Sequence, residues 1–393
     1  MTTVEAILPT VPPLSVLTES EREIAESIHQ FAVETIGPRS HAMDDANKID
    51  PELVRQFFDL DLMGIEIPEE YGGLGQTFGT SIAVIEALAR VDAACAVVVD
   101  VQNTLVNNAI LRWASPELKR RYLPQLAKSK VGAYALSEAE SGSDAFALKT
   151  RAEKKGDRWV LNGGKLWITN GLEAELFLVF ANVDFSKGYK GITGFLVESG
   201  WKGFTKGKKE DKLGIRASST LALAFEDLEI PEENVVGKVG EGYKIAIETL
   251  NEGRIGIGAQ MIGISRAALD YSARYVQTRV QFGKPISEFQ AIQHELARMD
   301  MELECARLAV YNAARLKEAG MPFAREGAIA KLKASEVAEY CTSKGLELLG
   351  GYGYVKDYPL EKMYRDAKIG KIYEGTSYMQ LSTIAKDVLK RTA

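Results

Sequence analysis

The sequence predicts an α+β protein with an N-terminal α-helical domain, a middle antiparallel β domain and a C-terminal helical bundle. Three observations support this order: apolar residues recur at helical spacing up to about residue 130, short β-branched and aromatic runs follow, and helical spacing returns near residue 239. The chain of 393 residues is long enough for two or three domains. We place the domains at residues 1–132, 133–238 and 239–393.

The N-terminal third is expected to be helical. Ser20 and Glu23 have the spacing of an N-terminal capping box, in which each side chain bonds to the backbone N–H of the other residue. Apolar residues then recur every three or four positions. Beyond a glycine-rich loop at 71–75, two apolar helices are expected over 80–91 and 93–111.

The middle region contains short runs rich in β-branched and aromatic residues, separated by glycine-containing turns, and these runs predict an antiparallel sheet. The predicted strands are 158–163, 176–180, 192–197 and 220–225. Downstream, the apolar residues from Phe289 to Val310 alternate spacings of three and four, which is the pattern of a bundle helix. A second long helix is expected over 323–349, after a glycine–proline break.

Charge and composition argue against several kinds of partner. The formal net charge is -6 and no long basic run is present, so nucleic acid is not expected as a partner. The three cysteines form no CxxC pair, which favours reduced thiols, and the three widely spaced histidines predict no metal site. No uninterrupted run of about eighteen apolar residues occurs, so no membrane span is predicted.

The first twenty residues contain two glutamates but no lysine or arginine. Mitochondrial presequences are rich in arginine and poor in acidic residues, and secretory signals begin with basic residues. The sequence therefore predicts a bacterial cytoplasmic protein. The mature form of a mitochondrial matrix protein, already trimmed, is the alternative.

Two segments around the predicted helix-to-sheet boundary could bind a cofactor, and each also has a purely structural explanation. Segment 134–144 is rich in serine and glycine, so its backbone could approach a flat heteroaromatic edge or a phosphate, or it could simply link two domains. Within segment 165–171, Trp167 offers a large surface for stacking and Thr169 a hydrogen bond beside it. The alternative is a core tryptophan at the end of a strand.

Three further segments lie in the helical C-terminal region. Gly253 is unfavourable inside a helix by about 1 kcal/mol relative to alanine, so a ligand or a close helix crossing is expected there. Arg279 has the forked guanidinium that suits a pyrophosphate, although it could also be a solvated residue at a helix end. The glycine-rich segment 348–354 does not follow a predicted strand, so it does not fit a Rossmann turn.

Glu374 is the candidate catalytic residue. It lies in the segment 371–377, where glycine, threonine and serine follow it in a predicted turn. A carboxylate held beside an acyl thioester could remove the proton next to the carbonyl group. Taken alone, a glutamate in this setting is ordinary turn chemistry, so the assignment depends on the segments that accompany it.

Together and in this order, these segments resemble the acyl-CoA dehydrogenases, over about residues 17–390 and closest to the short/branched-chain members that act on 2-methyl-branched substrates. Other segments that carry this resemblance are 86–92, 102–105, 143–150, 188–193, 250–257 and 365–370. The resemblance implies the family fold, in which the C-terminal domain is a four-helix bundle. It also implies a homotetramer.

The resemblance implies an FAD-dependent oxidation of short-chain or 2-methyl-branched acyl-CoA to trans-2-enoyl-CoA. Glu374 would remove the α-proton, and its backbone N–H and a ribityl hydroxyl of FAD would bind the carbonyl oxygen. The β-hydride would pass to flavin N5 and the electrons then to an electron-transferring flavoprotein. Burial should raise the pKa of Glu374 towards neutrality. The alternatives are an acyl-CoA oxidase that uses O₂, typically a longer chain, and a non-catalytic acyl-CoA- or flavin-binding scaffold.

The family motifs also assign the binding residues. Those expected to hold FAD, partly from a neighbouring subunit, are Tyr134, Leu136, Ser137, Gly142, Ser143, Trp167, Ile168, Thr169, Arg279, Phe282, Gln290, Glu347, Leu348, Gly350, Gly351, Thr376 and Ser377. Those expected to bind the substrate are Ser143, Tyr189, Tyr243, Asn251, Glu252, Gly253, Arg254, Tyr373 and Gly375. Isovaleryl-type members carry the base where this chain has Gly253, so Glu374 has no rival there. The stretch 93–101 has no lysine or arginine, which argues against a dicarboxylate substrate.

Overall fold

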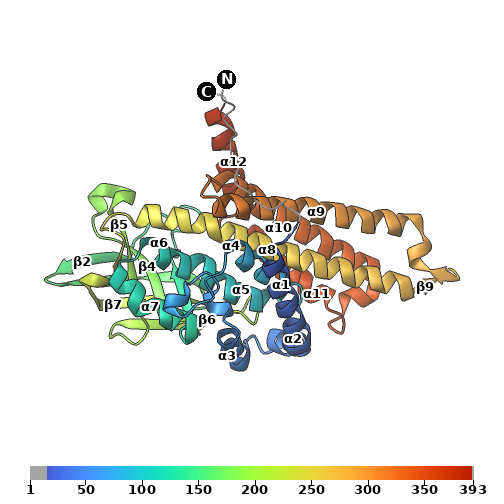
Figure 1. Ribbon diagram of the computed structural model, residues 1–393, viewed down its shortest axis with the longest axis horizontal. Helices are drawn as coiled ribbons and strands as arrows, with labels where there is room; N and C mark the ends of the chain where they lie inside the picture. Colours follow the sequence, from blue (N-terminus) through green and yellow to red (C-terminus); the bar gives the residue numbers. More distant parts are fainter. Residues whose placement is uncertain (1–15, 392–393) are drawn as a thin grey trace, which may run out of the picture.

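The computed structural model describes residues 16–391. Figure 1 shows a sheet at one end of the long axis and the small β9–β10 hairpin at the other, with the long helix α8 running between them. The N-terminal helices pack along one side of this axis, and the last helix, α12, projects from the bundle. The first fifteen residues, on which the expectation about a leader largely depends, lie outside the described part of the chain.

Helices build the first and last thirds of the chain. The α-helices are α1 (Glu19–Phe31), α2 (Gly37–Asp45), α3 (Pro51–Asp59), α4 (Phe78–Ala89), α5 (Ala93–Asp100), α6 (Asn108–Trp113), α7 (Pro116–Lys128), α8 (Gly242–Thr278), α9 (Gln290–Glu318), α10 (Ala324–Leu349), α11 (Leu360–Ala367) and α12 (Ser377–Arg391). Two π-helical segments are η1 (Ala32–Ile36) and η4 (Val101–Asn107). The 3₁₀ segments are η2 (Leu62–Gly64), η3 (Glu69–Tyr71), η5 (Phe185–Gly191), η6 (Glu232–Asn234), η7 (Ile286–Glu288), η8 (Gly350–Tyr354) and η9 (Lys368–Lys371).

The capping box of α1 exists, but it lies two residues before the predicted position. Thr18 is the N-cap, its hydroxyl accepts from the backbone N–H of Glu21, and the Glu21 carboxylate accepts from the N–H of Thr18. The prediction of Ser20 with Glu23 was wrong. Thr18 with Glu21 has the same spacing, so the sequence pattern alone does not distinguish the two pairs. Burial separates them, since Glu21 also pairs with the buried Arg315 of α9.

The predicted apolar helix over 93–111 is a single helical rod, α5–η4–α6, with a π-helical middle. Among the described residues, Ala93–Trp113 is the one helical stretch that is long and apolar enough to cross a membrane, with a mean hydropathy of 1.3 over its 18-residue apolar window. Because 89% of that window is buried inside the protein, the core accounts for its apolar composition. The rod packs against α8, and this contact positions the candidate site.

The middle region forms an eight-stranded sheet whose main order is β6-β7-β3-β2-β4-β5-β8, with β1 beside β4. Its strands are β1 (Gly132–Ala135), β2 (Arg151–Lys155), β3 (Arg158–Thr169), β4 (Leu176–Asn182), β5 (Ile192–Glu198), β6 (Phe204–Lys209), β7 (Thr220–Pro231) and β8 (Val235–Val236). A separate two-stranded hairpin, β9 (Val280–Gln281) and β10 (Lys284–Pro285), follows α8. All four predicted strands are present. The pairings are antiparallel except those of β4 with β1 and with β2, which are parallel.

Candidate active site

Glu374 lies in a short turn between η9 and α12, and hydrogen bonds fix this turn from two sides. Its φ of 52° and the φ of 86° at Gly375 are both in the left-handed region, which is unusual for a residue with a side chain. The buried Lys331 of α10 donates to the Gly375 carbonyl at 2.7 Å. Gln380 of α12 donates to the carbonyls of Glu374 and Gly375 at 3.1 and 2.8 Å. These hydrogen bonds hold the strained backbone in place, and with it the carboxyl group of Glu374.

The Glu374 carboxyl group is set up to accept a proton. Its Oε2 atom is buried and has no hydrogen-bond partner in the protein. Burial raises the pKa of Glu374 to about 7, against the opposing effects of the Lys331 and Arg254 charges. An unpartnered carboxyl with a pKa near neutrality is a general-base candidate, because it is available as a base and still binds a proton readily.

Gly253 of α8, which has no side chain, lies beside the Glu374 carboxyl group. A Cβ placed on Gly253 would lie 3.1 Å from Glu374 Oε2 and 2.7 Å from Leu105 Cδ2. The close approach expected at Gly253 is therefore present. The neighbouring Glu252 side chain leaves this group and pairs instead with Asn108 at 2.9 Å and Lys317 at 3.2 Å. A substrate contact predicted for Glu252 would have to come from its backbone.

Other predicted substrate residues lie around this turn and along α8. Arg254 bonds to the Asn251 side chain at 3.0 Å, and its Nε atom is buried without a partner. The Tyr373 hydroxyl donates to the side-chain oxygen of Gln260, whose amide nitrogen donates to the carbonyl of Ala93 at 2.7 Å. Tyr373 is thereby tied to both α8 and α5.

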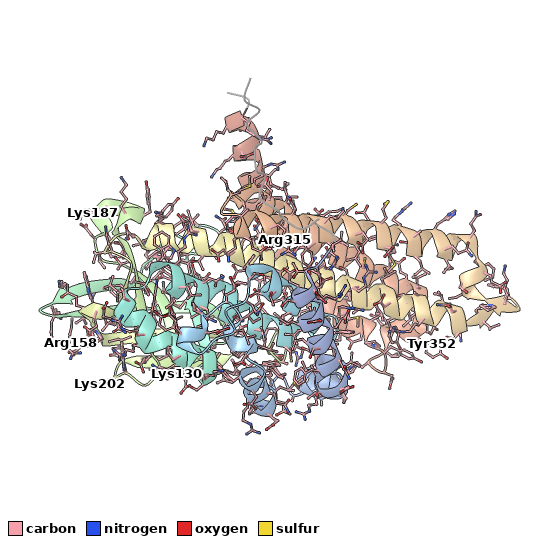
Figure 2. All side chains as sticks on the ribbon, viewed as in Figure 1. Lys130, Arg158, Lys187, Lys202, Arg315 and Tyr352 are labelled. Carbon is pink, nitrogen blue, oxygen red and sulfur yellow. The ribbon has the colours of Figure 1, made fainter. Side chains whose placement is uncertain are left out.

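An aromatic cluster lies at the start of α8. Tyr243 packs between Tyr189 and Phe146, with ring centroids 4.5 and 4.3 Å away. Tyr189 is half-exposed on η5, the segment that carries Lys187 at the sheet end of the molecule in Figure 2. The predicted residues Tyr189 and Tyr243 thus contact one another. Phe146, which no sequence motif singled out, completes the cluster.

A buried ion pair holds the segment that follows β1. Lys165 of β3 donates to Glu138 at 2.7 Å and to the carbonyl of Leu136 at 3.1 Å. Burial lowers the pKa of Lys165 to about 8 although Glu138 opposes this shift. Glu138 also accepts from the backbone N–H groups of Lys149 and Thr150. Neither charged residue was predicted for the site, and together they fix this segment at both ends.

The predicted FAD residues of this segment differ in exposure. Tyr134 is buried and its hydroxyl approaches the Ala246 carbonyl at 3.4 Å, while the Ser137 carbonyl accepts from the N–H of Leu166. Gly142 and Ser143 are exposed, and a Cβ on Gly142 would meet nothing within 4 Å. The tip of this segment is therefore accessible to a ligand.

Trp167 is 58% exposed, and its backbone φ of 63° is in the left-handed region. The alternative of a core tryptophan is therefore wrong. Ile168 beside it is buried, and Thr169 pairs with Thr220 of β7 in the sheet. A register shift between β3 and β7 at this point turns the indole outward. An exposed indole on a strained backbone provides a stacking surface.

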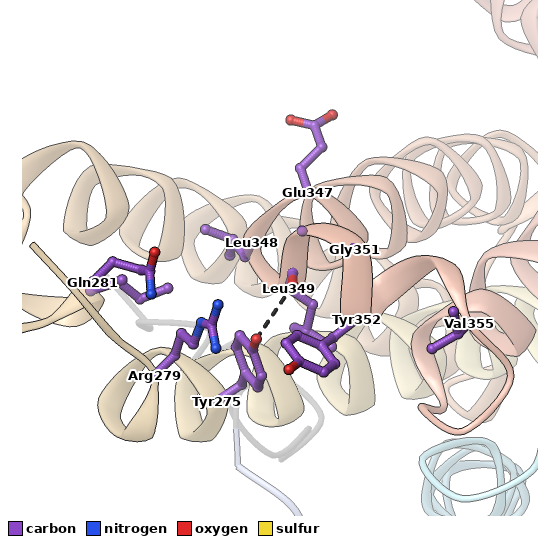
Figure 3. Close-up of a pocket in the computed structure, with 11 residues that line it drawn as sticks. Tyr275, Arg279, Gln281, Glu347, Leu348, Leu349, Gly351, Tyr352 and Val355 are labelled. Carbon is purple, nitrogen blue, oxygen red and sulfur yellow. Dashed lines mark hydrogen bonds between the residues drawn. The ribbon is translucent and has the colours of Figure 1, made fainter.

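A second group of predicted residues lines a pocket of about 590 Å³ at the far end of α8 (Figure 3). The lining includes Arg279, Glu347, Leu348, Gly350 and Gly351. The Arg279 guanidinium lies 5.3 Å from the ring centroid of Tyr352, and Tyr275 donates to the carbonyl of Leu349 at 3.4 Å. A Cβ on either glycine would meet nothing within 4 Å, so the backbone here is open to a ligand.

Two of the residues grouped with Arg279 do not reach this pocket. Phe282 is 93% exposed at the tip of the β9–β10 hairpin, and Gln290 is exposed at the start of α9. In Figure 3 the Glu347 side chain points away from Arg279, so its backbone rather than its carboxylate faces the pocket. In the turn that carries Glu374, the hydroxyl of Ser377, next to Thr376, is buried without a hydrogen-bond partner. Within residues 16–391, no group of three or more His, Cys, Asp or Glu side chains could hold a metal ion.

Family models match almost all of this chain in three successive blocks. The N-terminal, middle and C-terminal domains of acyl-CoA dehydrogenase match residues 18–130, 133–228 and 240–389. The chain belongs to the acyl-CoA dehydrogenase family. The resemblance found in the sequence motifs and the family fold expected from it are both confirmed.

Relatives narrow the type of acyl-CoA dehydrogenase. The chain is 51% identical to the mitochondrial short/branched chain specific acyl-CoA dehydrogenase of Rattus norvegicus, over 96% of this chain and 87% of that protein. Its fold matches butyryl-CoA dehydrogenase from Megasphaera elsdenii with a TM-score of 0.94 and 41% identity, over 95% and 99% of the two chains. It matches equally well, at TM-score 0.94 and 42% identity over 96% and 99%, a chain from a study of the electron transferring flavoprotein of Acidaminococcus fermentans and flavin-based electron bifurcation.

Proposed function

We propose that this member of the family is an FAD-dependent dehydrogenase that converts short-chain or 2-methyl-branched acyl-CoA to trans-2-enoyl-CoA, with Glu374 as the base. The observation that carries the proposal is the buried, unpartnered Oε2 atom of Glu374, which the hydrogen-bonded turn holds beside Gly253 of α8. A non-catalytic scaffold would have no need of a buried carboxyl group that sits on a strained backbone and has a pKa of about 7. The short/branched-chain relative supports the choice of substrate class.

The residues present fit FAD. The exposed indole of Trp167 offers a surface for the ring system. The pocket with Arg279 and the open backbone of Gly350 and Gly351 lies at the far end of α8, so it suits the pyrophosphate and nucleoside of an FAD bound to a neighbouring subunit. The unpartnered hydroxyl of Ser377 is a further polar group that a ligand could satisfy. When bound, the flavin supplies the acceptor for the hydride that leaves the β-carbon.

The protein's own residues then have distinct tasks. Glu374 takes the α-proton on its carboxylate, and its backbone N–H, by resemblance, binds the thioester oxygen where negative charge develops. Lys331 holds the Gly375 carbonyl and, with Arg254, keeps the pKa of Glu374 from rising further. The aromatic cluster of Tyr189, Tyr243 and Phe146 is suited to flank the CoA moiety near the N-terminal end of α8.

We further propose an electron-transferring flavoprotein as the electron acceptor and a homotetramer as the assembly. The similarity to a chain studied with such a flavoprotein supports the first part. The homotetramer is supported by Phe282, which is almost fully exposed and lies outside the Arg279 pocket of its own chain. This position suits a contact with the cofactor site of a neighbouring subunit. For the location, a bacterial cytoplasm or a mitochondrial matrix both agree with the relatives.

An absorbance scan of the purified protein, followed by anaerobic addition of butyryl-CoA or 2-methylbutyryl-CoA, tests the proposal. We expect a flavin spectrum that bleaches with at least one of these thioesters and recovers when an electron-transferring flavoprotein is added. Release of hydrogen peroxide in air, at the rate of substrate oxidation, would support an oxidase instead. A flavin spectrum that no acyl-CoA bleaches would refute the dehydrogenase proposal.

The rate of flavin reduction at low acyl-CoA concentration should rise with pH through about 7, because the protonated Glu374 carboxyl cannot accept the α-proton. Lys331→Met should move this midpoint upward, since the Lys331 charge lowers the pKa of Glu374. Lys368→Met is the matched control, because Lys368 pairs with Glu339 on the surface. Stopped-flow absorbance over a pH series measures the midpoint in wild type, Lys331→Met and Lys368→Met. An unmoved midpoint in Lys331→Met would contradict the assigned electrostatic role.

A further inference from the structure

The chain between β1 and β2 makes an excursion from the sheet over residues 136–150. Its tip, Gly142 and Ser143, is exposed, and the family motifs assign both residues to the flavin. The buried Glu138 side chain closes the excursion, because its carboxylate accepts the backbone N–H groups of Lys149 at 2.6 Å and of Thr150 at 3.2 Å. One carboxylate therefore joins the two ends of a segment whose tip faces solvent.

Lys165 ties the base of this segment to β3. Its side chain is fully buried, and its Nζ atom donates to Glu138 at 2.7 Å and to the carbonyl of Leu136 at 3.1 Å. Beside it, the backbone N–H of Leu166 donates to the carbonyl of Ser137 at 2.9 Å. All three bonds run from β3 to the first residues of the segment, so the start of the segment has a fixed position on this strand.

The same strand carries the exposed indole. Lys165 pairs with Leu223 of β7, and this is the last regular pair before the register shift that precedes Ile168. Trp167 lies within the shift, two residues after Lys165. The ammonium group therefore stands at the point where β3 turns the indole outward, and it holds the segment that carries the exposed tip. Both surfaces assigned to the flavin are referred to this one ion pair.

Charge strengthens the link. Burial acts to raise the pKa of Glu138, but the Lys165 charge and the hydrogen bonds from Thr150 and Lys149 bring it below its ordinary value, so the carboxylate is ionised. Burial lowers the pKa of Lys165 to about 8, which leaves the ammonium charged at neutral pH. Hydrogen bonds between ionised partners are about twice as strong as neutral ones. A segment held in this way loses less conformational entropy when a ligand binds to it, and this favours tight binding.

We propose that the Lys165–Glu138 pair is a positioning unit for the flavin, which sets the separation between the Gly142–Ser143 tip and the Trp167 indole and so determines how tightly the flavin is held. The inference rests on the proposed function, because FAD is the ligand that it assumes. Neither charged side chain is assigned a contact with flavin or substrate. Both act through the backbone that they hold.

The test compares the holoenzymes of wild type and three variants. Lys165→Met removes the ammonium group, and Lys165→Met/Glu138→Gln also removes the carboxylate charge. Lys154→Met is the matched control, because Lys154 pairs with Glu232 on the surface of the same sheet. Recovery of FAD fluorescence on dilution measures the dissociation rate of the flavin. We expect this rate to rise on the order of 10-fold or more in both Lys165 variants and to stay within about twofold of wild type in Lys154→Met.

The double variant separates positioning from stability. It leaves no uncompensated buried charge, so its urea midpoint should recover towards that of wild type, while FAD release should stay fast because the link to β3 is still missing. At saturating FAD, the visible circular dichroism of the bound flavin should differ from wild type in both Lys165 variants, which a loss of stability alone would not cause. Slow, wild-type FAD release in the double variant overturns the inference, and so does an unchanged flavin spectrum.

Hydrogen exchange in wild type gives a check that does not depend on the folding of any variant. The N–H groups of Lys149 and Thr150 should stay protected after FAD dissociates on dilution, because Glu138 holds them before the flavin binds. Rapid exchange of these two amides once the flavin has left overturns the inference. Wild type without any bound flavin would refute the proposed function, and this inference with it. A bound flavin that no acyl-CoA bleaches would refute the dehydrogenase alone, since FAD release and the flavin spectrum still test the positioning role.

Discussion

Replacing Glu374 with glutamine is expected to give a folded, yellow protein whose flavin reduction by acyl-CoA is slower by about 10²-fold or more, the usual contribution of a general base. Glutamine keeps the length and shape of the side chain, so the turn held by Lys331 and Gln380 should remain. It has no carboxylate to accept the α-proton. The absence of a hydrogen-bond partner at Oε2 means that no protein contact is lost at that atom.

Stopped-flow absorbance with butyryl-CoA measures the loss of rate. Glu336→Gln, an exposed glutamate on α10, is the matched control and should leave the rate unchanged. Full activity of Glu374→Gln would remove Glu374 as the base. Retention of flavin in that variant separates a chemical defect from a failure to assemble the site.

Thermal stability gives an independent reading of the same carboxyl group. Because the pKa of Glu374 is about 7 in the folded protein and 4.5 is its ordinary value, folding favours the protonated form. The stability that this group contributes is complete below about pH 4.5 and is lost as the pH rises through 7. Glu374→Gln should therefore raise Tm relative to wild type at pH 8 more than at pH 5. An equal change at both values would contradict a perturbed pKa.

The features that the sequence predicts well are those carried by local patterns. Helical and strand periodicities give the α–β–α order, and the Gly/Thr/Ser turn places Glu374 outside a regular helix. A glycine inside the α8 pattern correctly predicts a close approach at residue 253. The order of elements and the turn are determined by near neighbours in the chain. The glycine at 253 is also visible without knowledge of the fold, although it does not show that Leu105 and Glu374 are its partners.

The residues that were missed act through partners far away in the sequence. Lys331 reaches the Gly375 carbonyl, and Lys165 reaches Glu138. A lysine in an apolar run carries no sign of which distant atom will accept its hydrogen bond. Trp167 was ambiguous for a related reason, because its outward direction depends on a register shift between β3 and β7. Tertiary pairing decides these cases, and local pattern does not contain it.

The largest loss of stability is expected from Lys362→Met, because Lys362 of α11 neutralises two buried carboxylates. It lies 3.1 Å from Asp92, the N-cap of α5, and 2.7 Å from Asp366. Burial acts to lower the pKa of Lys362, but Asp366 and Asp92 together raise it above its ordinary value, so the ammonium stays charged. Methionine fills a similar volume without the charge. We expect the free energy of unfolding to fall on the order of 3–5 kcal/mol, the cost of leaving buried charges without their partner.

The urea midpoint of the holoenzyme measures this loss. Lys356→Met is the control, because Lys356 pairs with Asp45 on the surface, where solvent screens the pair and its loss should move the midpoint little. Adding Asp92→Asn and Asp366→Asn to Lys362→Met should recover part of the stability, since no buried charge then remains and asparagine can still cap α5. Recovery would show that uncompensated charge, and not lost packing, causes the defect. A single variant as stable as wild type would mean that the two carboxyls take up protons at little cost.

The same network explains why the effect of Lys362→Met should reach the candidate active site. Asp366 also accepts the backbone N–H of Ile215, which follows β6, so one cluster joins the N-terminal helices, the middle region and the C-terminal bundle. The candidate site is assembled from those same three parts. Leu105 lies on the N-terminal rod, Trp167 on the sheet, and Glu374 in the C-terminal turn between η9 and α12. In Lys362→Met, flavin should therefore dissociate at urea concentrations below those that unfold the helices. Simultaneous loss of flavin absorbance and helical circular dichroism would contradict this role as a link between the three parts.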